Sequence, residues 1–273
     1  MNEPSRRQNG PKPNDTYTGT DRGVSDVVGY VLAFAVILAS VGLVSTFGIN
    51  ALETVRENQQ ENNAEGAFDV MAENFDEIEQ NLAPSRTAEV DLHDGRMSVQ
   101  NVTEFAIRVE HDQTKDFVER VHPKRIVLQP DLTSQNIITY VNGATIRGQN
   151  GTQQGVIQNN PQMVCNGEQV VVSMVTLNTS EDRQLGGGTV RITGTEKDTR
   201  LIYPVNRTGQ NSSTNVSDDF EIRINGGFER AWRKALVQSD EQNWERGTGD
   251  TIVCPDPKRV FVRETVITVT FVR

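Results

Sequence analysis

The sequence predicts an α+β fold, in which a long N-terminal helix precedes an antiparallel β-sandwich-like domain that carries one surface helix. Three observations predict this fold class: an uncharged apolar stretch over 27–49, short strand-like runs between turn residues over 86–226, and apolar side chains at helical spacing over 228–236. The same observations divide the chain into a leader, a helical segment and a β domain, at residues 1–23, 24–83 and 84–273.

The apolar stretch is long enough to cross a membrane. A helix over residues 27–49 covers about 34 Å at about 1.5 Å per residue, and the hydrocarbon layer of a bilayer is about 30 Å thick. The alternatives are a buried core helix and a cleaved secretory signal, whose apolar region is only about 7–15 residues long. We therefore expect a membrane span.

The charges beside the stretch predict its orientation. Arg7, Lys12 and Arg22 precede it, whereas Arg56 follows it among several glutamates. Because cytoplasmic flanks carry the excess of Lys and Arg, we expect the N-terminus to be cytoplasmic and residues 50–273 to be extracellular. The leader itself is polar and almost free of large apolar side chains, so we expect it to be disordered.

The junction between leader and stretch resembles the class III signal of archaeal type IV pilins. Arg22-Gly23 is followed by Val24 and then by the long apolar segment, although Asp26 stands where the haloarchaeal form usually has proline. The resemblance implies that a prepilin peptidase cuts between Gly23 and Val24. It also implies that the freed helix anchors the protein in the membrane or assembles it with other pilin-like subunits.

Four further runs resemble an uncharacterised family of haloarchaeal pilin-like surface proteins. They are GAFDVMAEN at 66–74, APSR at 83–86, LGGGTVR at 185–191 and CPDPKRV at 254–260. This resemblance implies a surface location and the same architecture, and it carries no activity.

The composition is acidic. The net charge is −10, and Arg outnumbers Lys 21 to 6, which is typical of a halophilic protein kept in solution by its charge. Nucleic-acid phosphates require a basic face, so we expect no nucleic-acid partner.

The helix is expected to continue to Leu82 and to stop before Pro84, which cannot continue it. Its second half carries apolar side chains three and four residues apart, so that they share one face; they are Phe68, Met71, Phe75, Ile78 and Leu82. We expect this stripe to pack on the chain's own sheet, and an intersubunit seam is the alternative.

The expected strands are short runs rich in β-branched and aromatic residues. They lie at 89–92, 96–102, 105–110, 117–122, 125–128, 137–141, 144–147, 169–177, 189–194, 199–203, 220–224, 260–262 and 266–272. Asn142-Gly143 predicts a tight hairpin, because both positions accept positive φ. We expect 189–194 to pair with 199–203, the last run to form a buried central strand, and Trp232 to anchor the helix at 228–236 on the core.

Small residues recur in the apolar stretch at a spacing of four. Gly29 and Ala33 form one pair and Ala35 and Ala39 form another, and such pairs let apolar helices approach closely. The alternative is that Gly and Ala are simply common in membrane helices.

Cys165 and Cys254 are the two cysteines of the chain. On the outer side of a membrane they can form a disulfide or remain two thiols. Two cysteines without spaced His or Cys partners fall short of the four ligands of a structural zinc, so we expect no metal site.

Sequons for N-glycosylation are frequent in the region expected outside the cell. The candidate acceptors are Asn101, Asn150, Asn178, Asn206, Asn211 and Asn215. The last three lie in one polar run, which is expected to be an accessible loop. A plain Ser/Asn loop with coincidental motifs is the alternative.

The sequence contains no recognisable catalytic motif. His93, His111 and His122 lie in none of the usual catalytic or metal-binding patterns, so we expect neither enzyme activity nor a cofactor. The first functional hypothesis is a pilin-like structural or accessory surface protein. The alternative is an unpolymerised single-pass surface glycoprotein with an adhesive β domain, and a membrane-tethered enzyme comes third.

Overall fold

The computed structural model describes residues 21–110, 116–132, 134–179, 184–204, 219–238 and 242–273. The chain forms two compact units, Met1–Arg56 and Glu57–Arg273. The described residues form α1 (Asp21–Glu79), β1 (Ser85–Asp91), β2 (Arg96–Gln100), β3 (Glu104–Val109), β4 (Phe117–Val121), β5 (Arg125–Gln129), β6 (Asn136–Val141), β7 (Ala144–Gln149), β8 (Gly155–Asn159), β9 (Met163–Cys165), β10 (Gln169–Asn178), β11 (Gln184–Gly186), β12 (Thr189–Tyr203), β13 (Phe220–Asn225), α2 (Glu229–Val237), β14 (Glu245–Arg246), β15 (Thr251–Cys254) and β16 (Arg259–Val272).

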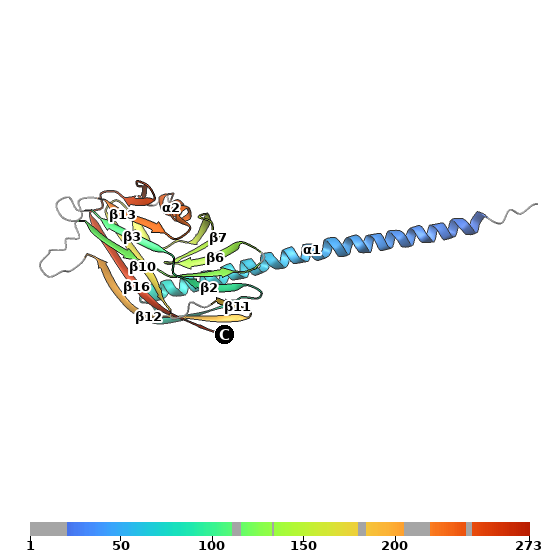
Figure 1. The fold of residues 1–273 in the computed structure, drawn as a ribbon, viewed down its shortest axis with the longest axis horizontal. Coiled ribbons are helices and arrows are strands. Elements are labelled where there is room, and N and C mark those ends of the chain that lie inside the picture. The colour runs from blue at the N-terminus through green and yellow to red at the C-terminus, as the bar shows by residue number, and fades with distance from the viewer. Residues whose placement is uncertain (1–20, 111–115, 133, 180–183, 205–218, 239–241) are drawn as a thin grey trace, which may run out of the picture. The chain divides into compact units, whose positions relative to one another are not determined.

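The strands of the second unit form three sheets (Figure 1). The first sheet has the order β1-β12-β16-β10-β9, the second β11-β2-β5-β6-β7-β8, and the third β14-β15-β13-β3-β4. All pairs are antiparallel except β10 with β16, which run parallel over ten residues. The predicted fold class, a long helix followed by a mostly antiparallel β domain, is therefore confirmed.

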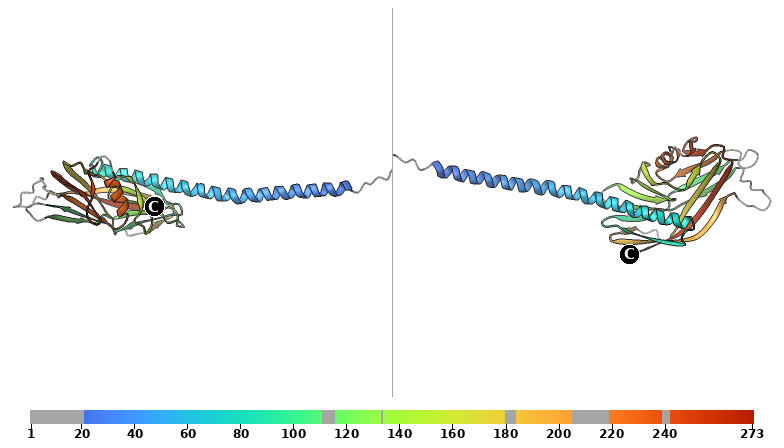
Figure 2. Two further views of the ribbon diagram at one scale, coloured as in Figure 1. Left: turned by 90° about the horizontal axis from the view of Figure 1, so that it is seen from above. Right: turned by 180° about the vertical axis from the view of Figure 1, so that it is seen from behind.

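The C-terminal part of α1 lies in the core of the second unit, along strands of the first and second sheets (Figures 1 and 2). Four side chains of the predicted stripe are fully buried there, at 0–1% exposure: Phe68, Met71, Phe75 and Ile78. They meet apolar residues of β1, β12, β16 and β10 from the first sheet and of β2, β5 and β6 from the second. The prediction that the stripe packs on the chain's own sheet is confirmed for these four residues.

The prediction is wrong for Leu82, because α1 ends three residues earlier. Asn81 adopts a left-handed conformation with φ 58°, the amide of Leu82 donates to the carbonyl of Glu77, and that of Asn81 donates to the carbonyl of Ile78. These two bonds form a Schellman motif, which caps the free carbonyls of the last turn. Leu82 is consequently turned outward and is 69% exposed.

A glycine in β12 makes room for the helix. A Cβ on Gly194 would lie 2.6 Å from Cε1 of Phe75, too close for any larger residue. The Phe75 ring also contacts Tyr140 of β6 edge-to-face, with ring centroids 5.1 Å apart. One aromatic side chain of α1 thus touches both sheets, as expected for an element built into the core.

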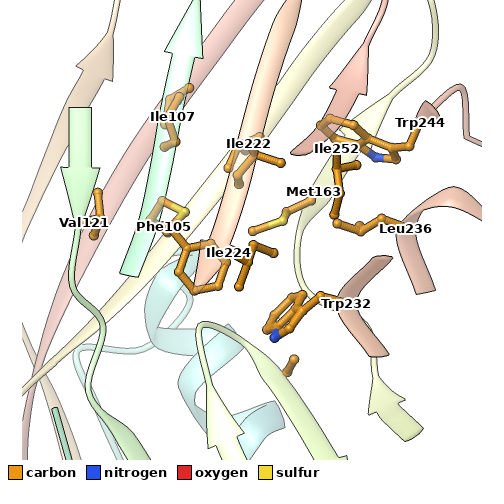
Figure 3. Close-up of a cluster of buried hydrophobic side chains, with 14 of the residues drawn as sticks. Phe105, Ile107, Val121, Met163, Ile222, Ile224, Trp232, Leu236, Trp244 and Ile252 are labelled. Carbon is orange, nitrogen blue, oxygen red and sulfur yellow. The ribbon is translucent and has the colours of Figure 1, made fainter. Parts of the chain in front are cut away.

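A second core lies between the third sheet and the other two, and α2 closes it (Figure 3). Trp232 and Leu236 point from α2 toward the strands, and the ring of Trp232 meets Phe105 of β3 edge-to-face at 5.4 Å. Trp232 is fully buried, so its predicted anchoring role is confirmed. The hairpin at Asn142-Gly143 is confirmed as well, with φ of 50° and 76°.

Two predicted strand breaks are wrong. The runs at 189–194 and 199–203 are not a hairpin but one strand, β12, which pairs with β16 on both sides of an irregularity between Glu196 and Asp198. The runs at 260–262 and 266–272 are likewise one central strand, β16. Glu264 lies within this strand, and its buried carboxylate accepts hydrogen bonds from Arg200 and Thr176, at 2.7 Å each.

The expected boundary between residues 83 and 84 marks the change from helix to strand but does not separate two compact units. The second unit begins at Glu57, because the side chains of α1 from Ala64 onward belong to its core. Five short strands were not predicted from the sequence, namely β8, β9, β11, β14 and β15, of which only β8 is longer than four residues. Such short runs have little periodicity of their own.

Candidate membrane anchor and predicted surface sites

The first unit contains the candidate membrane span. Asp26–Ile49 of α1 is 24 residues long, has a mean hydropathy of 2.6, and has none of its side chains buried. A helix of this length and composition suits a membrane span or a signal sequence, and its exposure distinguishes it from a helix buried in this chain's own core.

The small residues of this segment lie on two faces of the helix. Gly29 and Ala33 are one turn apart on one face, and Ala35 and Ala39 are one turn apart on another. At about 3.6 residues per turn the two faces are separated by about 120°. A Cβ on Gly29 would meet no atom of the described residues within 4 Å. The segment can therefore receive close neighbours on two sides.

The processing site predicted from the pilin resemblance lies at the start of the same helix. Arg22, Gly23 and Val24 follow Asp21, the first residue of α1. Their backbone is helical, and their side chains lie outside the described residues.

Cys165 and Cys254 form a disulfide, with their Cα atoms 5.9 Å apart. Cys165 ends β9 of the first sheet and Cys254 ends β15 of the third, and both are fully buried. The bond therefore links two sheets across the second core, which neither residue's local sequence revealed.

The predicted glycosylation sites differ in their surroundings. Asn101 and Asn150 are exposed, and Asn150 lies in the turn after β7. Asn178 is half-buried at the end of β10, where it pairs with Thr268 of β16. The structure thus presents Asn101 and Asn150 more openly than Asn178. The other three, Asn206, Asn211 and Asn215, lie outside the described residues.

A group of polar residues at the C-terminal end of α1 was not predicted from the sequence. Glu79 is 1% exposed and forms an ion pair with Arg263 of β16. Nearby, burial and the charge of Glu79 raise the pKa of Asp76 to about 7, and a hydrogen bond from Asn159 offsets part of this rise. The sequence does indicate that these two acids are close to the core, because Asp76 and Glu79 lie next to Phe75 and Ile78 of the stripe.

The loop between β6 and β7 completes this region. Asn142 is 1% exposed, and its side-chain oxygen accepts a hydrogen bond of 2.8 Å from the amide of Val175 in β10. The hydroxyl of Tyr140 is buried nearby, and burial together with the Asp76 carboxylate raises its pKa well above the usual value. These contacts join the two sheets around the helix end. Glu79 and Arg263 also line a cavity of about 410 Å³ at this end of the helix.

The histidines are dispersed in the structure. His93 Nδ1 lies 3.2 Å from a carboxylate oxygen of Asp91, His122 Nε2 lies 3.2 Å from one of Glu104, and His111 is outside the described residues. Among the described residues, no group of three His, Cys, Asp or Glu side chains is placed to hold a metal ion.

Comparison with known proteins identifies a family. The model of DUF7289, a family of unknown function, matches residues 22–270. This range includes both the apolar helix and the β domain. No curated protein and no solved structure matches the chain.

Proposed function

The chain belongs to the DUF7289 family, whose function is unknown, and we propose that it is a pilin-like structural or accessory cell-surface protein. Its apolar helix anchors it in the membrane or assembles it with other pilin-like subunits. In this proposal the N-terminus is cytoplasmic before processing, prepilin peptidase removes residues 1–23, and the β domain is extracellular.

The observation that carries the proposal is the contrast between the two parts of α1. Asp26–Ile49 is apolar and has no buried side chain, whereas the stripe from Phe68 to Ile78 is buried in the core of the chain's own β domain. The first part must therefore be covered by lipid or by other helices, because exposing so much apolar surface to water is unfavourable. Two small-residue faces on that segment favour contact with more than one neighbour.

A second candidate is an unpolymerised single-pass surface protein with a binding β domain. It is favoured by the packing of the β domain, in which buried side chains of α1 and α2 belong to the two cores. A domain of this kind functions equally well on a lone anchor.

N-terminal sequencing of the membrane-extracted protein tests the processing step. We expect the mature chain to begin at Val24. Gly23→Asp is expected to leave a longer precursor, because the bulky charged side chain does not fit where the peptidase requires a small residue. Gly23→Ala serves as the matched control and is expected to be processed. A mature N-terminus before Arg22 or beyond Ala35 contradicts the proposal.

Crosslinking in membranes distinguishes the two candidates. Ala33→Leu and Ala35→Leu fill the two small-residue faces, so each is expected to lower the yield of crosslinked oligomers and pelletable filaments without affecting insertion. Val36→Leu is the control, since it adds bulk at a position that is already large. Normal processing without oligomers or filaments in the parent protein would favour the second candidate.

Topology is tested with protease added to intact cells. We expect the β domain to be removed and an N-terminal tag on the unprocessed Gly23→Asp variant to be protected. Cleavage of that tag from outside would reverse the proposed orientation.

A further inference from the structure

The second unit carries a basic groove, which we define by its four lining residues, Arg230, Arg233, Lys234 and Arg246. The groove has a volume of about 280 Å³ and lies on the surface of α2 beside β14. The described residues that line it are all cationic, although the net charge of the whole chain is −10. The spacing of cations on α2 and the position of β14 bring these positive charges together.

Local structure gathers the first three cations. Arg230, Arg233 and Lys234 are three and four residues apart on α2, so they are neighbours on the helix surface. Burial of Trp232 and Leu236 in the core fixes the rotation of the helix about its axis. The cationic face is thereby held toward solvent.

The fourth cation comes from a neighbouring strand. β14 pairs with β15, with Arg246 opposite Ile252, and this pairing places Arg246 beside α2. Successive side chains of a strand point to opposite sides, so Glu245 points away from the side that Arg246 occupies. The strand therefore adds a positive charge to the groove without its adjacent carboxylate.

Among the described residues, few carboxylates compensate these charges. Arg233 forms an ion pair with Asp250, whereas Arg230, Lys234 and Arg246 have no ion pair among the described residues. Glu229 is the nearest acid along α2, and its Oε1 accepts hydrogen bonds from the amides of Gly226 and Gly227 at the start of the helix. Uncompensated cations in a concave site attract anions and raise their local concentration.

We propose that the basic groove binds an anionic polysaccharide through its sulfate or uronate groups. Guanidinium groups bind such oxyanions through paired, charge-assisted hydrogen bonds, and three of the four lining residues are arginines. The volume is at the small end of the range for ligand sites, which suits one charged sugar unit of a longer chain. Among the residues that the structure describes, no aromatic side chain lines the groove, so this lining lacks the stacking platform of single-stranded nucleic-acid sites. The proposal does not depend on the pilin-like function.

Binding to the full-length chain in neutral detergent tests the proposal. The probes are dextran sulfate and polygalacturonate, with uncharged dextran as the negative control and double-stranded DNA as the competing class of polyanion. We expect both acidic polysaccharides to bind at low ionic strength, to weaken as salt is added, and to bind more tightly than DNA.

Paired variants assign the binding to the groove. Arg230→Gln/Arg246→Gln is expected to weaken it by at least about tenfold, because two charge-assisted contacts are lost. Arg230→Lys/Arg246→Lys keeps the charge and is expected to retain most of the affinity. Arg86→Gln/Arg191→Gln removes the same charge elsewhere on the second unit and is expected to change the affinity less than about twofold.

Any of three results overturns the proposal: no binding of either acidic polysaccharide, equal loss in the two glutamine pairs, or tighter binding of DNA. The fluorescence of buried Trp232 and Trp244 shows whether each variant is folded. Should the first pair perturb the fold, Lys234→Gln/Arg246→Gln provides the same loss of charge in the groove, with the same expected outcome.

Discussion

Glu79, the last residue of α1, and Arg263, in the middle of β16, form an ion pair across 184 positions of sequence. The Glu79 side chain is 1% exposed and that of Arg263 is 35% exposed, so the pair closes the buried end of the helix onto the first sheet. The last turn of α1 contains no basic residue of its own. Arg263 therefore supplies the cation that the negative end of the helix favours.

Removing the cation alone should be costly. Arg263→Met leaves Glu79 buried without its partner, and we expect the free energy of unfolding to fall by about 3 kcal/mol. The double variant Glu79→Leu/Arg263→Met removes both charges and is expected to recover most of this loss. Urea unfolding followed by tryptophan fluorescence measures both variants, because Trp232 and Trp244 are buried in the β domain.

The control for this pair is an exposed one. Arg191→Met breaks the surface ion pair with Glu89, in which both side chains are more than half exposed, and should cost less than about 1 kcal/mol. If Arg263→Met and Arg191→Met lowered the free energy of unfolding equally, burial of the Glu79–Arg263 pair would add nothing to stability.

Stability should fall as pH rises through the titration of Asp76. The pKa of this carboxyl is about 7 in the folded chain, against an ordinary value of 3.8. Between these values the folded chain holds a proton that the unfolded chain has released. The free energy of unfolding therefore decreases from about pH 4 to about pH 7 and is independent of this group at higher pH.

Asp76→Asn should remove this dependence. Allowing for the partial exposure of the side chain, we expect a gain of about 1–2 kcal/mol at about pH 8 and little change at about pH 4. Asp94→Asn, which removes a carboxylate at an exposed position, is the matched control. A parallel shift of the Asp76→Asn curve at all pH values would contradict the assignment.

The β domain should require the end of α1 in order to fold. A fragment of residues 57–273 retains the buried stripe, whereas one of residues 84–273 lacks Phe68, Met71, Phe75 and Ile78. Losing a buried Phe alone costs about 3–5 kcal/mol, and a whole domain is stable by only about 5–15 kcal/mol. We expect the longer fragment to be folded and the shorter one to be unfolded.

Circular dichroism and tryptophan fluorescence distinguish the two fragments. Adding a peptide of residues 57–83 to the shorter fragment is expected to restore folding, because it supplies the missing part of the core. Cooperative unfolding of residues 84–273 alone would show that the helix only covers a domain that is stable without it.

The disulfide should contribute substantially to stability. It joins residues 89 positions apart, and closing a loop of this length restricts the unfolded chain enough to stabilise the fold by about 4 kcal/mol, or less where other effects oppose it. A reductant should therefore lower the midpoint of urea unfolding in the parent chain. The reductant should not change the midpoint of Cys165→Ala/Cys254→Ala. An equal shift of the midpoint in the parent chain and in this variant would rule out a contribution of the disulfide to stability.

Several elements could be predicted from the sequence because their signals are local. The apolar stretch, the stripe from Phe68 to Ile78, the turn at Asn142-Gly143 and the face of α2 that carries Trp232 are all encoded within a few helical turns or one hairpin. The interpretation of each depends on neighbours within the same element.

What only the tertiary structure decided are relationships between distant segments. The continuity of β12 depends on its pairing with β16. The parallel pairing of β10 with β16 brings together segments that are far apart in the sequence. Arg246 lines the basic groove only because of the position of β14. The Glu79–Arg263 pair follows the same rule. A single sequence specifies each residue's chemistry and local periodicity, but a partner from another sheet is chosen by the packing of the whole core, which has no local signature.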